Sequence, residues 1–380
     1  MADGWSLGVG QTLGVTLERA LDDLVDHHCH GILTADLDRA TFEGLMNEAV
    51  RASPLGTSLF DSTLGWAIRR HCATVLDLEP MVPAEEYLAR RAELGGAEVA
   101  RRMLGQARIA TFLVDTGIGP EDALTPMDEL ATIGGGTARE IVRLERVAEE
   151  VLAAGTGDFA GEAEERIGAA RAGGAVGAKS IAAYRVGLDL PGTKPSADAL
   201  ERALTGVDAS RLANRTVSGW LAHTAVELGL PLQFHVGYGD GDLDLLECDP
   251  LRLTAFLRAT QERGVPVLLL HNWPYHRHAA YLAQVFEHVF MDLGLTTHNT
   301  GALSTGVLRE TLELVPFGKL LFSSDAYGLA ELYLLGALLF RRSMSTVLGE
   351  LVDAGEATAE DAAYVAGLVA RENARRAYAL

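Results

Sequence analysis

Short apolar runs alternate with longer helical patterns along most of the chain, and this alternation limits the fold more than any other feature. The runs lack a regular polar alternation, which indicates parallel strands covered on both faces of the sheet. Eight such runs with helical crossovers predict an α/β fold, a parallel (β/α)₈ TIM barrel, and a doubly wound open sheet is the alternative. The predicted strands are 23–28, 108–115, 140–145, 175–182, 230–236, 265–271, 288–294 and 318–324.

The helical patterns and the remaining segments fit one domain over residues 1–380. Three helical patterns end in glycine, the residue that favours a helix C-terminus, at Gly173–Gly174, Gly229 and Gly264. Residues 34–107 contain amphipathic stretches without a convincing strand, so we expect a helical insertion after the first strand, over the barrel mouth. The Ala- and Glu-rich tail, 345–380, predicts extra C-terminal helices that pack on the outside of the barrel.

The composition excludes several classes of partner. A formal net charge of -20 disfavours nucleic acid and anionic membranes, because both would repel the chain. The three cysteines, Cys29, Cys72 and Cys248, are widely spaced, which argues against a disulfide framework. The sequence has neither a signal-peptide pattern nor an apolar run of membrane-spanning length, so we expect a cytoplasmic protein. A homo-oligomer is one option for the assembly.

The stretch LVDHHCHGI (24–32) ends the first predicted strand with three histidines. Successive side chains of a strand point to opposite faces, so His28 and His30 project together while His27 and Cys29 project the other way. Two imidazoles on one face at a strand end can bind one metal ion. A polar strand end that meets water is the alternative interpretation.

Other strand ends carry residues of the same chemical kind. His235 ends the fifth predicted strand, His271 ends the sixth, Asp325 follows the eighth and Lys179 lies near the end of the fourth. In a parallel barrel these ends converge on one face, where barrel enzymes build their sites. Each residue taken singly also has a structural interpretation. His235 could be a hydrogen-bonded core histidine, Asp325 could be a helix N-cap, and Lys179 could extend its side chain to solvent. Together they form the inventory of a metal site.

These motifs resemble the amidohydrolase superfamily. The DHHCH start, the single histidines after strands five and six and SSDA after strand eight carry the resemblance. The stretches KSIAAYRVGLD (179–189), LLHNWPYHRHAAYLAQVFEHVFMDLGL (269–295) and FSSDAYGLAELYLLGA (322–337) are similar to one branch. In that branch the domain occurs alone or fused to a glutamine-synthetase domain.

The resemblance implies a metal-ligand set. His28, His30 and Asp325 match positions that bind a catalytic divalent metal, and His235 matches a further ligand. His271 matches a second-metal ligand in two-metal members and a catalytic histidine in one-metal members. Lys179 matches a lysine that is carbamylated and bridges the two ions. The chain departs from the branch at His278, where the branch carries an acidic residue.

The residue types suit one or two divalent ions per chain, zinc first and manganese or iron as alternatives. Such an ion activates water at neutral pH, with Asp325 as the general base and His271 stabilising the attacked carbonyl group. An arginine beside a strand end suits a substrate carboxylate, so Arg185 with the neighbouring Tyr184 predicts substrate binding, and a surface salt bridge of Arg185 is the alternative. Arg143 and Glu145 are weaker candidates of this kind.

Three classes of function remain open. The first is metal-dependent hydrolysis of a C–N bond in a small-molecule substrate, with a γ-glutamyl-type amide as the class that the resemblance implies. The second is nonoxidative decarboxylation by the same ligands, with His271 as the acid. The third is a noncatalytic barrel, against which the intact ligand set argues.

Overall fold

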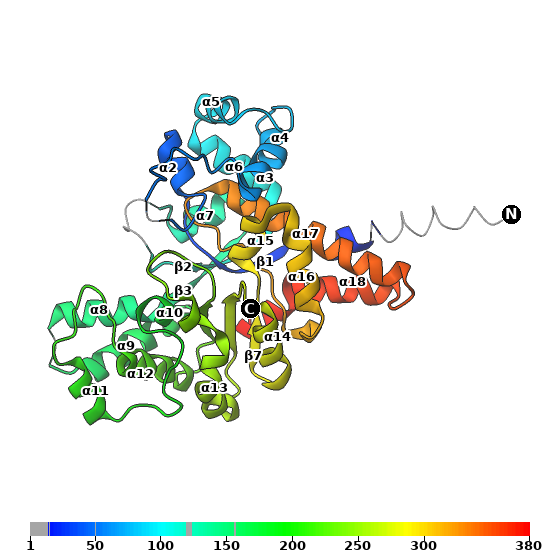
Figure 1. Cartoon of the computed structure of the whole chain (residues 1–380). Coiled ribbons are helices and arrows are strands. Elements are labelled where there is room, and N and C mark those ends of the chain that lie inside the picture. The colour runs from blue at the N-terminus through cyan, green and yellow to red at the C-terminus, as the bar shows by residue number, and fades with distance from the viewer. Residues whose placement is uncertain (1–13, 15, 50, 119–123, 156) are drawn as a thin grey trace.

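The computed structural model describes residues 14, 16–49, 51–118, 124–155 and 157–380. Seven parallel strands form one curled sheet in chain order, each hydrogen-bonded to the next, with helices around it (Figure 1). This confirms seven of the eight predicted strands and the parallel α/β architecture. The strands are β1 (Leu24–Cys29), β2 (Ile109–Asp115), β3 (Thr137–Arg143), β4 (Gly177–Ser180), β5 (Leu232–Val236), β6 (Val267–His271) and β7 (Val289–Met291).

The eighth predicted strand, 318–324, does not form a regular strand. Its segment nevertheless lies between the two edges of the sheet, because Leu321 donates its N–H to the carbonyl of Met291 in β7, and Phe322 accepts the N–H of His27 in β1. Phe322 donates its own N–H to the carbonyl of Val369, outside the sheet. The N–H of Ser324 goes to the Asp26 carboxylate. These hydrogen bonds take the place of the regular backbone pairing of a strand. The β1 and β7 edges of the sheet are therefore joined by an irregular segment.

Helices and short helical turns make up most of the rest of the described chain. The three predicted helix ends appear at their glycines: α9 has Gly173 as its C-cap, and α12 ends two residues before Gly229, whose φ is 71°. The 3-10 turn Gln261–Arg263 has Gly264 as its C-cap. The helices up to β5 are α2 (Arg39–Gly44), α3 (Thr63–Ala67), α4 (Ala73–Val75), α5 (Ala84–Leu94), α6 (Gly96–Ala107), α7 (Met127–Gly134), α8 (Leu144–Ala154), α9 (Phe159–Ala172), α10 (Ala182–Arg185), α11 (Ala197–Leu204) and α12 (Arg215–Glu227). Those after β5 are α13 (Thr254–Thr260), α14 (His276–Val285), α15 (Gly294–Thr300), α16 (Ser304–Leu312), α17 (Ala330–Asp353), α18 (Ala359–Gly367) and α19 (Asn373–Tyr378). Of the helices that the structure describes, none combines the length and apolar character that a membrane span requires.

The segment between β1 and β2 holds α2 to α6, and its described part contains no strand. Phe42, Phe60 and Tyr87 form an aromatic cluster that holds α2 and α5 together. The last helix, α6, packs against α17 and α7. A buried ion pair between Arg91 and Glu331 joins α5 to α17.

The C-terminal helices differ from the expectation that they pack only on the outside of the sheet. The side chain of Tyr378, on α19, is buried against inward-facing side chains of the strands. It lies against Gly177, the first residue of β4, and its hydroxyl contacts His27 and Gln233. Helix α19 therefore covers the end of the sheet opposite the carboxyl ends of the strands.

Candidate active site

Three histidines from two strand ends converge on Asp325. The Nε2 atoms of His28 and His30 lie 3.1 Å and 3.4 Å from Asp325 Oδ1. The Nδ1 atom of His271 lies 3.5 Å from Asp325 Oδ2. All four side chains come from the carboxyl end of the sheet, and the histidines are buried. His28, His271 and Asp325 each offer one donor atom, all within 4.8 Å of one another.

Lys179 lies beside this cluster. Its Nζ is 3.4 Å from His28 Nε2, and the side chain is buried. Burial lowers the pKa of Lys179 to about 8. A substantial fraction of this amine is therefore neutral near pH 8, the form that can react as a nucleophile or bind a metal.

The fifth strand brings His235 to the same cavity. Its ring centroid lies 4.6 Å from that of His271 and 4.5 Å from that of Tyr184. His235 Nε2 lies 3.0 Å from the carbonyl oxygen of Tyr238. Since a carbonyl only accepts, Nε2 carries the proton and Nδ1 keeps the lone pair that a metal would need.

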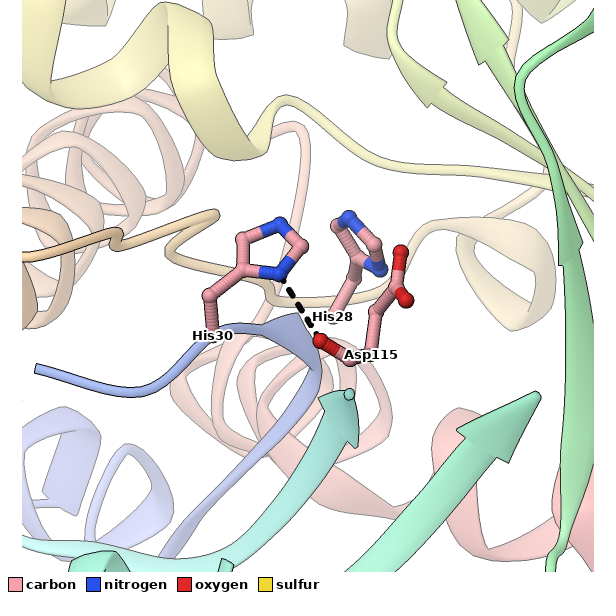
Figure 2. Close-up of side chains that lie close together, drawn as sticks. All are labelled: His28, His30 and Asp115. Carbon is pink, nitrogen blue, oxygen red and sulfur yellow. Dashed lines mark hydrogen bonds between the residues drawn. The ribbon is translucent and has the colours of Figure 1, made fainter. Parts of the chain in front are cut away.

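His30 also has one ring nitrogen on a backbone carbonyl, but here the nitrogen is Nδ1. Its Nδ1 lies 3.0 Å from the backbone carbonyl oxygen of Asp115, at the end of β2 (Figure 2). Nδ1 therefore donates, and the lone pair of Nε2 faces Asp325. Second partners that fix the tautomer in this way are typical of metal-binding histidines.

The pKa shifts favour the metal-binding forms of these groups. Burial lowers the pKa of His28 to about 3, assisted by the positive charge of Lys179, and lowers the pKa of His271 to about 4. Burial alone would raise the pKa of Asp325, but His271, His28 and His30 outweigh it and hold that pKa well below its usual range. Neutral imidazoles around a carboxylate are the donor set that zinc and similar ions prefer. His271 Nδ1 has no hydrogen-bond partner among the described residues, so the cluster fits a bound cation.

Asp115 is a site residue that we did not predict. It groups with His28 and His30 as a third donor (Figure 2). Its carboxylate is also held by Arg143, whose Nη2 and Nε lie 2.6 Å and 3.1 Å from Oδ2. The Arg143 charge is thereby paired within the protein. The signal was present in the sequence, since Asp115 ends the second predicted strand.

Glu145 lies in the first turn of α8 and not on the predicted third strand, and His278 lies on α14. Both have structural partners. Glu145 accepts hydrogen bonds from the Ser180 hydroxyl and the Ile181 N–H, and so fixes the turn after β4. His278 pairs with Asp249 at 3.0 Å. These contacts connect elements of the protein around the site.

His27 does not point away from the site as a regular strand would require. The pairing of β1 with β2 shifts register between Asp26 and Cys29, which is typical of a β-bulge. His27 Nε2 consequently lies 2.7 Å from the carboxylate of Asp292, beneath the cluster. The Cys29 thiol donates a hydrogen bond to the backbone carbonyl of Leu113.

A cavity of about 440 Å³ opens onto the cluster. The segment between β1 and β2 supplies residues 44–49 and Leu64 to its wall. Arg185 lines the cavity, with its Nη2 3.5 Å from Glu149 and its buried Nε without a partner among the described residues. Its other charged and polar walls include Glu48, Tyr184, Arg211, Asp240, Asp242, His298 and Asn299.

His298 is a second residue that we did not predict. It lies on α15, is buried, and lines the cavity. Burial lowers its pKa to about 4, so the imidazole is neutral at pH 7. Its place on the helix after β7, outside a predicted strand end, gave little signal in the sequence.

The family comparison covers almost the whole chain. A family model described as Amidohydrolase matches residues 25–380. Protein fluG from Emericella nidulans is 32% identical over 223 residues, which cover 54% of this chain and 26% of that protein. This chain thus spans only about a quarter of the length of that curated relative.

Solved structures with a similar fold include proteins of several activities. A protein assigned as a metal-dependent hydrolase from Lactobacillus casei ATCC 334 has a TM-score of 0.81 and 29% identity, covering 94% of this chain and 95% of that chain. A uronate isomerase from Thermotoga maritima has a TM-score of 0.66 and 13% identity, covering 97% of each chain. The second likeness concerns the fold alone.

Proposed function

This chain belongs to the amidohydrolase family, and from that premise we propose that it is a metal-dependent hydrolase of the C–N bond of a small amide. The observation that carries the proposal is the convergence of His28, His30 and His271 on the Asp325 carboxylate. A buried carboxylate with three imidazoles around it can serve both as a ligand and as a base.

The residues that would hold the metal are His28, His30, His235, His271 and Asp325, with Lys179 as a carbamylated bridge if two ions bind. A bound zinc, manganese or iron ion would lower the pKa of a water molecule and polarise the amide carbonyl group. The fixed tautomers of His30 and His235 each leave one lone pair for this task.

Asp325 is the general base of the proposed reaction. Its ionised carboxylate accepts a proton from the attacking water as the new C–O bond forms. The same proton then passes to the departing nitrogen as the C–N bond breaks, so the products are a carboxylic acid and an amine. His271, beside Asp325, would stabilise the negative charge that develops on the carbonyl oxygen.

The cavity wall supports a substrate that carries both signs of charge. Arg185, with the neighbouring Tyr184, would bind a carboxylate, and the buried Arg185 Nε without a partner among the described residues supports this assignment. Glu48 and Asp240 line the same cavity and would suit an ammonium group. A γ-glutamyl-type amide carries both groups on one end, so we assign that class as the substrate.

The test combines metal analysis with labelled water. Purified protein from zinc- and manganese-supplemented medium is screened against carboxylated small amides, γ-glutamyl amides included, in ¹⁸O-labelled water. We expect one or two metal ions per chain and one solvent oxygen in the carboxylate product. Asp325→Asn should lower the rate by about 10²–10⁴-fold while metal is still present, because the base is lost.

Asp249→Asn is the matched control, since Asp249 contacts His278 outside the cavity wall, and it should keep the parent rate. Negligible metal in the parent protein would overturn the proposal. Release of CO₂ without solvent oxygen in the organic product would instead establish the decarboxylase alternative.

A further inference from the structure

Asp292 lies just after β7, fully buried beneath the histidine cluster. Its Oδ1 accepts the backbone N–H of His271 at 2.6 Å and that of Gly294 at 3.1 Å. Its Oδ2 accepts the Ser323 hydroxyl at 2.9 Å and lies 2.7 Å from His27 Nε2. One carboxylate thus ties β1, β6, α15 and the segment before Asp325 to a single point.

The backbone that Asp292 holds has an unusual conformation. His271 and Asn272 have φ of 68° and 64°, the left-handed region that side chains other than glycine seldom adopt. Asp292 contacts both residues, because the Asn272 side-chain amide donates to the Asp292 carbonyl at 3.0 Å. On the other side, the Thr296 hydroxyl donates to the His271 carbonyl at 2.9 Å. Both backbone groups of His271 therefore have side-chain partners.

This conformation decides where the His271 ring points. A regular strand would continue past His271, and its side chain would stand on one face of the sheet. In the left-handed turn, the His271 ring instead lies with its Nδ1 atom 3.5 Å from Asp325 Oδ2. Loss of the contact to the His271 N–H would remove one of the two side-chain hydrogen bonds to the His271 backbone.

A chain of hydrogen bonds continues from Asp292 to the opposite end of the sheet. The Gln233 amide donates to the Tyr378 hydroxyl at 2.7 Å and to the His27 carbonyl at 2.7 Å. The Tyr378 hydroxyl, which accepts from Gln233, also lies 3.0 Å from His27 Nδ1. His27 Nε2 lies 2.7 Å from the Asp292 carboxylate, which only accepts, so Nε2 carries a proton.

We propose that Asp292 is a positioning residue that holds His271 in its left-handed turn and so aims Nδ1 at the metal site, with His27 and Tyr378 supporting it from below. The inference rests on the proposed metal role of His271. Partners of this kind orient metal-binding histidines, and their loss typically weakens metal affinity by about 10–100-fold.

The test measures Co²⁺ in place of the native ion, by its visible spectrum and by competition with a chelator. Asp292→Ala removes the acceptor of the His271 N–H, and we expect at least about tenfold weaker Co²⁺ binding and a changed spectrum. Asp292→Asn keeps an oxygen for that N–H and should stay within about threefold of the parent protein, a rescue that a role of the charge alone would not produce.

Glu331→Gln is the matched control. Glu331 is an equally buried carboxylate, but its side-chain partners are Arg91 and Tyr87, and it is not part of the cavity wall. We expect this variant to lose stability and to keep the parent Co²⁺ spectrum. A changed spectrum in Glu331→Gln as large as that of Asp292→Ala would show a general response to destabilisation and would overturn the proposal.

A folded Asp292→Ala protein with parent Co²⁺ affinity and spectrum would also overturn it. If Asp292→Ala does not fold, Thr296→Val decides, because it removes the other side-chain bond to the His271 backbone. This variant should weaken Co²⁺ binding by about threefold or more, and parent affinity would count against the proposal. A parent protein that binds no Co²⁺ would refute the proposed function itself, which separates the two failures.

Discussion

The buried ion pair between Arg91 and Glu331 offers a quantitative test of how the insertion is held on the sheet. Arg91 Nε lies 2.8 Å from Glu331 Oε1, and the same oxygen accepts the Tyr87 hydroxyl at 2.9 Å. The two charged side chains are 3% and 0% exposed, so neither has water to replace a lost partner. Glu331→Gln keeps an acceptor for Tyr87 but leaves the Arg91 charge buried and uncompensated.

Breaking such a pair from one side typically costs about 3–5 kcal/mol, mostly because of the charge left behind. The effect on the melting temperature follows from the size of the chain. At about 2.1 cal/mol/K per residue, 380 residues give an unfolding entropy of about 0.8 kcal/mol/K. Glu331→Gln should therefore lower the melting temperature by about 4–6 °C.

A double-mutant cycle measures the pair directly. Arg91→Met and Glu331→Gln are each compared with the parent and with the double variant, by urea denaturation and calorimetry. The double variant buries no unpaired charge, so its loss should be smaller than the sum of the two single losses by at least about 2 kcal/mol. Additive losses, or single losses below about 1 kcal/mol, would refute the argument that the buried charges depend on each other.

Three further outcomes follow from the site and its surroundings. Lys179→Met should lower the metal content to one ion per chain or less, by elemental analysis, and an unchanged content would rule out a bridging role. Arg185→Ala should raise KM for a carboxylated amide at least about tenfold, with a smaller change in kcat. Arg185→Lys should not restore the parent KM, since a lysine cannot bind a carboxylate in two places. A KM equal to that of the parent in Arg185→Ala would show that the substrate carboxylate binds elsewhere. Burial, with the Lys319 charge, lowers the pKa of His288 to about 4. The unfolded chain therefore takes up a proton between pH 6.5 and 4 that the folded chain does not, and stability falls as pH falls through that window. In His288→Asn the unfolding free energy should vary less steeply over this range, and an identical slope would contradict the assignment.

Strands such as β6 and β7 were predictable because each is an apolar run whose residues are all buried. Strand β3 was harder to delimit, because its first residues are polar and partly exposed. The eighth apolar run, 318–324, does not form a regular strand, and the local sequence pattern could not predict this. The Ser324 N–H has its partner in the Asp26 carboxylate, 298 positions away, and the Phe322 N–H has its partner on the C-terminal helices. Such partners depend on the finished tertiary structure.

The candidate site followed from one rule, that polar residues at the carboxyl ends of parallel strands meet. This rule brought His28, His30, His271 and Asp325 together correctly. It applied equally to Asp115, which ends the second predicted strand. Asp292 follows β7 in the structure but lies inside the predicted strand 288–294, so the rule did not find it. The predicted direction of the His27 side chain was wrong, because a β-bulge exchanges the faces of a strand. The pattern of apolar and polar residues in LVDHHCHGI does not reveal such a bulge.

The contacts between β1 and the last part of the chain have a consequence for how the protein folds. His27 meets Tyr378 over a separation of 351 residues, and the Asp26 carboxylate binds Ser324 across 298 residues. Contacts at such separations form late, because closing a long loop must precede any gain from them. During synthesis, all seven strands leave the ribosome before Asp325 does. The donor set is therefore incomplete in every nascent chain that ends before this residue, and a metal ion reaches its full ligand set only in a sheet that is already assembled. Metal binding would then act as a late check on folding, by stabilising chains whose two ends have met over chains whose ends remain apart.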